Sequence, residues 1–531
     1  MTAAPELLRG AELRSINPAT LELVGAVTAT DPEAVPEVVA ESRLAHERWA
    51  RTNHAERRRL FGAIARVLIE KMDQLAAVVT AENGKPLAEA YTAEVLVAVD
   101  NVRWIEANAE RVLRPERPRF TQPYLKHKRG WLLHEPLGVV AVISPWNFPF
   151  SIPFVQVATA VAAGNAVVVK PSELTPLTGD WISRVFDEAG VPAGLVRVVQ
   201  GDGAVGEALV RARGVSRVVF TGSTEVGRRV AAIAGERLCP VTLELGGKDP
   251  MLVFADADLE RAAAGAAFGA FANCGQVCTS VERIYVARER HDEFVQALAR
   301  RAGELRLGRG DDPGVELGPM ISEEQRARAE ALVDDALARG AQAVVGGRRP
   351  AIGLPGWFYE PSVLTGVDDE AGMQRDEVFG PVVSVQAFGS EEEAIRLANG
   401  TRYGLGASVW TADAARARRV AGRLETGMVW ANDVSYSFGV GAATWGGRKD
   451  SGFGRTRSRY GLLECSQVKF ADADSGRVPV PWWYPYGPAA VDGFRGLIRT
   501  VYGRGLVPRA AAAWTHKRGL AALGRRYVSR G

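Results

Sequence analysis

Cysteine and histidine are scarce in this chain, whose 531 residues include four Cys and six His. Four Cys are too few for a disulfide framework, and they indicate a reducing compartment. We therefore expect a cytoplasmic protein. The His residues show no metal-ligand spacing, and Cys274 and Cys278 have neither a second Cys pair nor a nearby His. The sequence therefore predicts no metal site.

The chain also lacks an excess of either charge, since it contains 65 Lys and Arg and 62 Asp and Glu. A formal charge of +3 excludes a global basic field, so no nucleic-acid partner is expected. Residues 136–169 contain no charged residue, but their four Pro, two Asn and one Gln do not suit a lipid-exposed helix. We expect a buried strand, loop, helix and strand there. Residues 1–13 lack the apolar segment of a secretory signal.

Strands and helices alternate in the middle of the chain. The predicted strands span 166–169, 195–199 and 217–220, and the helices between and after them span 176–189, 204–213 and 224–234. Such alternation predicts right-handed crossovers and a parallel sheet, whose ligands bind at the carboxyl ends of the strands. A second α/β unit follows, with strands at 281–286, 343–345 and 382–387.

Cys278 follows a Gly275-Gln276 turn. A lone Cys in apolar surroundings is usually a small core residue, and this interpretation suits Cys274, Cys239 and Cys465. At Cys278 the turn ends the preceding helix, so we expect the next residues to open a new one. A helix N-terminus favours the thiolate, which is the form that acts as a nucleophile.

Two polar side chains stand beside chain-turning residues. Glu244 leaves a predicted strand into a Gly-Gly turn, and is either a solvated turn residue or a positioned base. Asn147 lies between Pro145 and Pro149. Its amide either caps a turn or donates a hydrogen bond to a developing oxyanion.

Two features after the strands suit a dinucleotide. Lys170 and Glu173 are either a surface ion pair or a donor and an acceptor for ribose hydroxyls. The segment 222–227 has a Gly at each end and allows a helix N-terminus to approach a phosphate. Its spacing differs from the Gly-x-Gly-x-x-Gly fingerprint, so alone it is a weak signal.

Together these stretches resemble the aldehyde dehydrogenase superfamily over roughly residues 15–470. Seven motifs occur in the family's order: Pro-Trp-Asn-Phe-Pro (145–149), Lys-Pro-Ser-Glu (170–173), Phe-Thr-Gly-Ser-Thr-Glu-Val-Gly (220–227), Leu-Glu-Leu-Gly-Gly-Lys (243–248), Gly-Gln-Val-Cys (275–278), Glu-Val-Phe-Gly-Pro (377–381) and Gly-Met-Val-Trp-Ala-Asn (427–432).

The resemblance implies a role for each matched position. Cys278 would be the nucleophile and Glu244 the general base, while Asn147 and the backbone N–H of Cys278 would hold the oxyanion. NAD is the expected cofactor, and NADP stays open. The residues implied in binding it are Ile143, Trp146, Lys170, Glu173, Gly203, Phe220, Gly222, Ser223, Thr224, Glu225, Val226, Gly227, Leu245, Glu377 and Phe379.

The implied fold is α/β, with a doubly wound parallel-sheet cofactor domain and a second α/β catalytic domain. We expect the NAD(P)-binding domain at 1–115 and 137–246, and the catalytic domain at 247–445. A small strand element for oligomerisation would comprise 116–136 and 446–470, which implies a homodimer or homotetramer. Residues 471–531 would form a C-terminal tail with helices.

The expected reaction is oxidation of an aldehyde to a carboxylic acid, through a thioester on Cys278 that Glu244 helps to hydrolyse. Three alternatives remain: a coenzyme-A-acylating relative, a cofactor-free hydrolase of the Cys-Glu-Lys type, and a non-catalytic binding protein. One position departs from the family. Many relatives carry a second Glu after Ser-Gly-x-Gly-Arg, where this chain has Thr456 and then Arg457.

The tail differs from the rest in composition, with ten Lys and Arg against three Asp in residues 471–531. Four aromatic residues lie between 479 and 488, Asp492 is expected to cap one helix, and another is expected from about Ala510. Docking on the body of its own or a neighbouring subunit is the favoured interpretation. A solvated extension and a basic amphipathic membrane contact are the alternatives.

Overall fold

The computed structural model describes residues 8–9, 12–474, 476, 480, 482–484 and 486–528. The chain divides into two compact units. The main unit comprises Met1–Leu113 and Glu135–Gln467, and the second unit comprises Arg114–His134 and Val468–Gly531. The expected domain boundaries cut the main unit further, and they stay a prediction.

A six-stranded sheet forms the first half of the main unit, in the order β17-β9-β8-β5-β6-β7. Its strands are β5 (Val139–Ile143), β6 (Ala166–Lys170), β7 (Val196–Val198), β8 (Val215–Thr221), β9 (Val241–Glu244) and β17 (Gly452–Phe453). All neighbours pair in parallel except β17, which runs antiparallel to β9. The alternating pattern thus gives the parallel sheet that was predicted.

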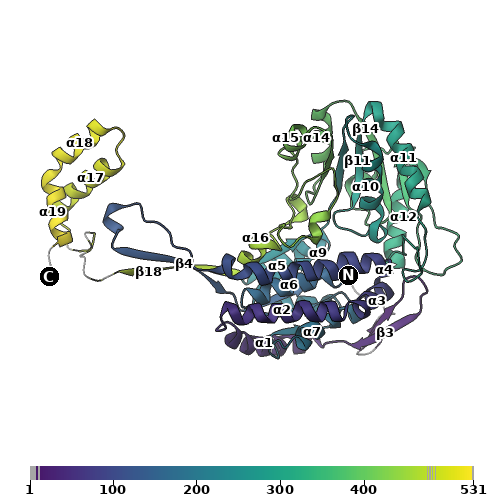
Figure 1. The fold of residues 1–531 in the computed structure, drawn as a ribbon, viewed down its shortest axis with the longest axis horizontal. Helices are drawn as coiled ribbons and strands as arrows, with labels where there is room; N and C mark the ends of the chain where they lie inside the picture. The colour runs from purple at the N-terminus through teal and green to yellow at the C-terminus, as the bar shows by residue number, and fades with distance from the viewer. Residues whose placement is uncertain are drawn as a thin grey trace. The chain divides into compact units, whose positions relative to one another are not determined.

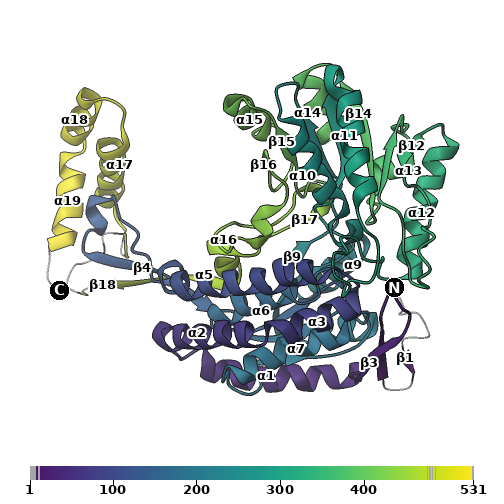
Figure 2. The ribbon, with the colours of Figure 1, turned by 45° about the vertical axis from the view of Figure 1, so that its right-hand side comes forward.

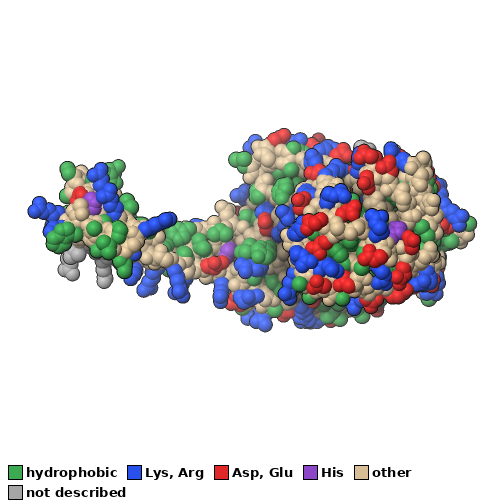
Figure 3. Space-filling model, turned by 90° about the horizontal axis from the view of Figure 1, so that it is seen from above, with side chains coloured by type: hydrophobic (Ala, Val, Ile, Leu, Met, Phe, Trp, Pro, Cys, Tyr) green, Lys and Arg blue, Asp and Glu red, His purple; other side chains and the backbone are tan. Residues whose placement is uncertain are grey.

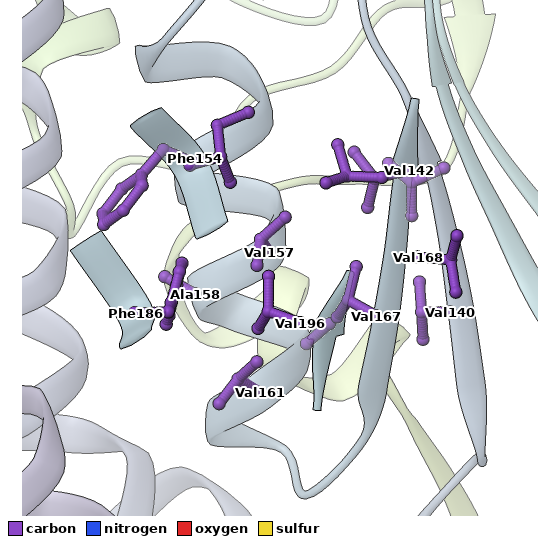
Figure 4. Close-up of a cluster of buried hydrophobic side chains, with 14 of the residues drawn as sticks. Val140, Val142, Phe154, Val157, Ala158, Val161, Val167, Val168, Phe186 and Val196 are labelled. Atoms are coloured by element: carbon purple, nitrogen blue, oxygen red, sulfur yellow. The ribbon is translucent and has the colours of Figure 1, made fainter. Parts of the chain in front are cut away.

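Helices surround this sheet (Figures 1 and 2). They are α1 (Val35–Trp49), α2 (His54–Glu70), α3 (Met72–Asn83), α4 (Leu87–Glu89), α5 (Leu96–Leu113), α6 (Ser151–Ala162), α7 (Pro176–Glu188), α8 (Gly203–Arg211), α9 (Thr224–Glu236) and α16 (Ser458–Glu464). The uncharged stretch is the predicted strand, loop, helix and strand, namely β5, α6 and β6. Every residue of α6 is buried. Figure 4 shows Phe154, Val157 and Val161 of this helix beside the valines of the sheet.

A seven-stranded sheet forms the second half, in the order β12-β13-β14-β11-β10-β15-β16. Its strands are β10 (Asp249–Val253), β11 (Val281–Ala287), β12 (Gln342–Val345), β13 (Ser362–Thr365), β14 (Val382–Phe388), β15 (Ser408–Trp410) and β16 (Trp430–Ala431). Only β12, at one edge, pairs antiparallel. The accompanying helices are α10 (Leu259–Phe271), α11 (His291–Glu304), α12 (Glu323–Ala338), α13 (Gly372–Arg375), α14 (Glu391–Asn399) and α15 (Ala414–Ala421).

Three further strands pair near the N-terminus, namely β1 (Leu8–Arg9), β2 (Glu12–Ile16) and β3 (Leu23–Thr28). The second unit contains the pair β4 (Lys128–Pro136) and β18 (Ser466–Asp474), which share hydrogen bonds. It ends in α17 (Pro488–Tyr502), α18 (Leu506–Thr515) and α19 (Lys517–Val528). The predicted α/β class with C-terminal helices is therefore confirmed.

Two details of the tail were predicted wrongly. The first helix begins at Pro488, so Asp492 lies inside it rather than at its N-cap. Pro suits the first turn of a helix, because the backbone N–H that Pro lacks would have no hydrogen-bond partner there. The expected second helix is in fact two, which meet at His516. No helix in the described part of the chain is long and apolar enough to cross a membrane.

Candidate active site

The carboxyl ends of three neighbouring strands bring predicted cofactor residues side by side. Ile143 at the end of β5 pairs in register with Lys170 on β6 and with Phe220 on β8. One strand further, Thr221 pairs with Glu244. Residues up to a hundred positions apart in sequence therefore share one edge of the sheet, which is where parallel sheets bind ligands.

Lys170 and Glu173 form an ion pair at this edge. The Lys170 ammonium donates to Glu173 Oε2 at 3.1 Å and to the carbonyl of Pro171 at 3.0 Å. Lys170 is buried and Glu173 is half-buried, so the interpretation as a surface ion pair is wrong. The pair offers a positive donor and a negative acceptor close together, as the two hydroxyls of a ribose require.

The 222–227 segment opens α9, whose N-cap is Ser223. Ser223 Oγ accepts from the N–H of Val226 at 3.4 Å, and the first turn also contains Thr224 and Glu225. A side chain at Gly222 would collide with the Phe220 ring, because its Cβ would lie 2.7 Å from that ring. The bare backbone keeps the helix N-terminus accessible, and such N-termini bind phosphate.

Two glycines and an apolar residue complete this side of the edge. Gly227 packs against Leu245, where a Cβ would lie only 2.5 Å from Leu245 Cδ2. Gly203 is the first residue of α8 and is exposed. The N-termini of α8 and α9 thus follow two strands of the six-stranded sheet, β7 and β8.

Glu377 and Phe379 come from the second half of the main unit. Glu377 Oε1 accepts from the N–H of Gly247 at 3.0 Å, and burial raises the pKa of Glu377 to about 8. The Phe379 ring meets the Trp146 ring edge-on, with centroids 5.4 Å apart. The loop before β14 therefore contacts the loop after β9 through Glu377 and the loop after β5 through Phe379.

Cys278 lies in a turn just before β11, and no helix begins there. The expected stabilisation of its thiolate by a helix N-terminus is therefore wrong. Burial, helped by the negative charges of Asp249, Glu377 and Glu244, instead raises the pKa of the Cys278 thiol above its usual range. Before this turn, Asn273 and Cys274 have a left-handed backbone, with φ of 51° and 57°. Such strain is typical of functional turns.

The Gly-Gly turn after Glu244 allows this Cys to approach closely. A Cβ at Gly247 would lie 2.2 Å from the carbonyl oxygen of Cys278. Only glycine permits that contact without moving one backbone. The turn thus fixes the distance between the segment carrying Glu244 and the segment carrying Cys278.

The carboxyl group of Glu244 is almost completely buried, with 4% of the residue exposed. Neither oxygen has a hydrogen-bond partner among the described residues. Burial raises its pKa to about 8, while the positive charges of Arg455 and Arg457 lower it. A carboxyl group that titrates near neutral pH and has free oxygens suits a general base.

Asn147 is buried beside the Cys278 turn. Its Nδ2 donates to the carbonyl of Gln276 at 3.0 Å, so the amide N–H points at the turn two residues before Cys278. Its backbone carbonyl accepts from Lys85 Nζ at 2.8 Å and from Asn273 Nδ2 at 2.9 Å. Lys85 is in turn paired with the buried carboxylate of Glu94 at 2.7 Å.

Arg457 is the main site residue whose position the sequence did not predict. Its guanidinium stacks over the rings of Phe438 and Trp445, at 4.1 and 5.6 Å from the centroids. Only 4% of Arg457 is exposed, and its Nη1 has no hydrogen-bond partner within the part of the chain described. Its departure from the family pattern was the one available signal.

Cys278, Glu244 and Arg457 line one cavity. Apolar side chains dominate its wall, and Cys278 and Glu244 both line it. The lining residues are Ile152, Val155, Gln156, Thr221, Glu244, Leu245, Cys278, Phe438, Trp445, Thr456 and Arg457. No group of three or more potential metal ligands occurs among the described residues.

Comparison with known proteins decides the family. A sequence model of the aldehyde dehydrogenase family matches residues 8–471. The chain belongs to the aldehyde dehydrogenase family. It is 38% identical over 493 residues to a 4,4'-diapolycopene aldehyde oxidase of Methylomonas sp, covering 92% of this chain and 91% of that one. It is 36% identical over 478 residues to a betaine aldehyde dehydrogenase of Bacillus subtilis, covering 89% and 96%.

Solved structures of dehydrogenases and of an NADP-dependent enzyme share the fold. The NAD+ complex of an aldehyde dehydrogenase from Bacillus cereus superposes with a TM-score of 0.84 at 35% identity, covering 88% of this chain and 94% of that one. An NADP-dependent enzyme from E. coli superposes with a TM-score of 0.84 at 34% identity, covering 88% and 95%. This aldehyde dehydrogenase is thus an NAD(P)-dependent oxidoreductase that oxidises an aldehyde to a carboxylic acid.

The residues at the sheet edge fit such a cofactor. The Lys170–Glu173 pair, the open start of α9 and the Glu377 carboxyl offer donors and acceptors to riboses and phosphates. Gly222, where a Cβ would collide with Phe220, has no side chain and so leaves room for a cofactor phosphate to approach the backbone.

Proposed function

We propose that Cys278, Glu244 and Asn147 carry the reaction of this aldehyde dehydrogenase. The observation that supports these roles is that Cys278 and Glu244 line one cavity, while the Asn147 amide is held against the Cys278 turn. The Cys278 sulfur adds to the aldehyde carbon and forms a thiohemiacetal. The Asn147 Nδ2–H and the backbone N–H of Cys278 stabilise the resulting oxyanion.

The thiol must lose its proton before it attacks. Burial and, to a smaller extent, three nearby carboxyl groups oppose this loss. A bound oxidised nicotinamide would supply a positive charge near the sulfur and would accept the hydride from the thiohemiacetal carbon. Lys85 and Asn273 keep the Asn147 backbone in place throughout, because both donate to its carbonyl.

Hydrolysis of the thioester completes the reaction. Glu244 takes a proton from a water molecule, the hydroxide adds to the acyl carbon, and the C–S bond breaks. The carboxylic acid leaves and the Cys278 sulfur is restored. A coenzyme-A-acylating enzyme would release the acyl group to a thiol instead, and the free oxygens of Glu244 favour water.

Replacing Cys278 tests this assignment. Cys278→Ala should abolish NADH formation from hexanal while NAD still binds, as measured by fluorescence titration. Cys274→Ala, at a buried thiol four residues away, is the control and should keep its activity. Retention of more than a trace of activity in Cys278→Ala would reject the role of this thiol, and loss of NAD binding would show that the change disturbed the cofactor site.

We further propose that NAD is preferred over NADP. Glu173 places a carboxylate where the ribose 2′-hydroxyl would sit, and a 2′-phosphate there costs on the order of 1 kcal/mol in like-charge repulsion. Lys170 reduces that cost, because its ammonium lies 3.1 Å from the same carboxylate. The kcat/KM ratio of the two cofactors tests the proposal, and Glu173→Gln should move it towards NADP by about fivefold.

The charge of Arg457 affects which aldehydes the cavity accepts. Its guanidinium lies on the cavity wall with Cys278, and remains cationic at neutral pH although burial lowers its pKa to about 10. A quaternary ammonium substrate such as betaine aldehyde would meet this charge at short range. We therefore propose uncharged aldehydes as substrates, and expect hexanal to show a higher kcat/KM than betaine aldehyde.

The remaining proposals concern assembly and location. Val468 and Phe470 of β18 expose more than half of their area, as a strand covered by a second copy would. A homodimer or homotetramer is thus proposed, with light scattering as the test. All four Cys are free, which fits the proposed cytoplasmic location.

A further inference from the structure

The three C-terminal helices pack through small residues. A Cβ at Gly519 of α19 would lie 2.3 Å from the backbone nitrogen of Gly493 on α17, so the two helices touch backbone to backbone. Asp492 of α17 also contacts His516, the residue between α18 and α19, at 2.6 Å. This packing buries the side of α17 that carries Ala490, Gly493 and Gly496.

The opposite side of α17 carries exposed apolar residues, and the hydroxyl of one of them, Tyr502, lies 3.4 Å from the hydroxyl of Tyr124. Val491, Ile498 and Tyr502 follow one another at intervals of seven and four, which places them on one face of a helix. Each exposes about half of its area or more. At the start of α18, Leu506 and Val507 are also exposed, by 83% and 79%.

Aromatic side chains extend the same kind of surface. Trp483, Tyr484 and Tyr486 precede α17, and Trp514 lies in α18; the most exposed, Tyr484, shows 85% of its area. Trp and Tyr are enriched where a bilayer meets water, because their rings are apolar and their edges polar. We call these four aromatics and the five aliphatic or tyrosine residues above the tail surface.

Positive charge accompanies the tail surface. The exposed basic residues of the three helices and the loop between α17 and α18 are Arg495, Arg499, Arg504, Lys517, Arg518 and Arg525. Asp492 is the single acidic residue after Asp474, and His516 partners it. Figure 3 shows Lys and Arg side chains among hydrophobic ones over these helices. A helix that combines basic and large apolar side chains in this way lies in the surface of a membrane.

We propose that the tail surface binds the surface of an anionic lipid bilayer. The helices lie on the bilayer and do not span it, since none in the described residues is long and apolar enough to cross. Charge decides against a second copy as the occupant, because the same basic residues would then face each other. It decides against nucleic acid too, since phosphates would leave Leu506 and Val507 in water. This proposal replaces docking on the enzyme body as the favoured interpretation of the tail.

Co-sedimentation of the full-length protein with vesicles tests the proposal. Binding should be tight to equimolar phosphatidylcholine and phosphatidylglycerol, weak to phosphatidylcholine alone, and reduced by salt. The triple variant Arg495→Gln, Arg504→Gln, Arg518→Gln should lose on the order of fivefold in partitioning per Arg removed. The triple variant Ile498→Ser, Leu506→Ser, Val507→Ser should lose about tenfold or more.

Matched controls come from exposed residues of the main unit. Arg43→Gln, Arg51→Gln, Arg58→Gln controls for charge, and Leu44→Ser, Leu96→Ser controls for exposed apolar area. Both should bind vesicles as the unaltered protein does, and all variants should keep its melting temperature. Absence of binding to anionic vesicles, or equal loss in the controls, would overturn the proposal. A lower assembly mass for the apolar variant without any vesicle binding would assign the surface to a second copy instead.

Discussion

Glu244 holds its proton more tightly than an ordinary glutamate, and this sets a pH dependence. With a pKa raised to about 8, the carboxylate that accepts a proton from water is present above that pH and lost below it. Steady-state turnover should therefore rise with pH through a midpoint near 8. Glu244→Gln should give a burst of NADH and then stall, because only deacylation needs the base. Unchanged steady-state turnover in that variant would contradict the base role.

Arg457 tunes the same titration. Its positive charge lowers the Glu244 pKa, so Arg457→Leu should shift the midpoint of the turnover profile to higher pH. Arg457→Lys keeps a charge and is the control, with a smaller shift expected. Profiles of the two variants that coincide with the unaltered enzyme would show that Arg457 does not act on Glu244 electrostatically.

Single residues show what sequence could and could not predict. The positions of Ile143, Lys170, Phe220 and Glu244 at one edge follow from alternating strands and helices, since parallel strands end together. The place of Arg457 does not follow, because it depends on a backbone with φ of 62° and on rings from Phe438 and Trp445. Neither does the support of Asn147 by Lys85, which joins residues 62 positions apart.

At the level of elements, the turn at Cys278 shows why a helix was expected and not found. Gly275 and Gln276 do end α10 and its short extension, as predicted. The strand β11, however, starts at Val281, which leaves too few residues after Cys278 for a helical turn. The nucleophile was predicted from its motif, whereas the acidity of its thiol depends on burial and on the carboxyl groups of Asp249, Glu377 and Glu244, which lie far from Cys278 in sequence.

The Gly246-Gly247 turn should be intolerant of side chains. Gly247→Ala places a Cβ against the Cys278 carbonyl, so the two segments must separate. We expect turnover to fall by about tenfold or more, since small misplacements of reacting groups are costly. Gly235→Ala on α9, where nothing lies within 4 Å, is the control and should leave turnover unchanged. Equal kcat for both variants would show that the close approach is not required.

At the scale of the whole molecule, the chain consists of two units that can be perturbed separately. Gly519→Val should push α19 away from α17, because the added atoms meet the Gly493 backbone. Vesicle binding and tail helicity by circular dichroism should fall, while hexanal turnover is unchanged. Gly524→Val, on the same helix with open space around it, is the control. A loss of turnover in Gly519→Val would show that the units are coupled.

The distribution of thiols in the molecule has a practical consequence. Cys239, Cys274 and Cys465 are buried, and Cys278 alone is partly accessible and faces the cavity. An alkylating probe therefore has one target per chain, and the label incorporated at saturation counts competent centres rather than total protein. Because the pKa of the Cys278 thiol is raised in the free enzyme, the labelling rate would report how far any ligand in the cavity promotes ionisation of the sulfur.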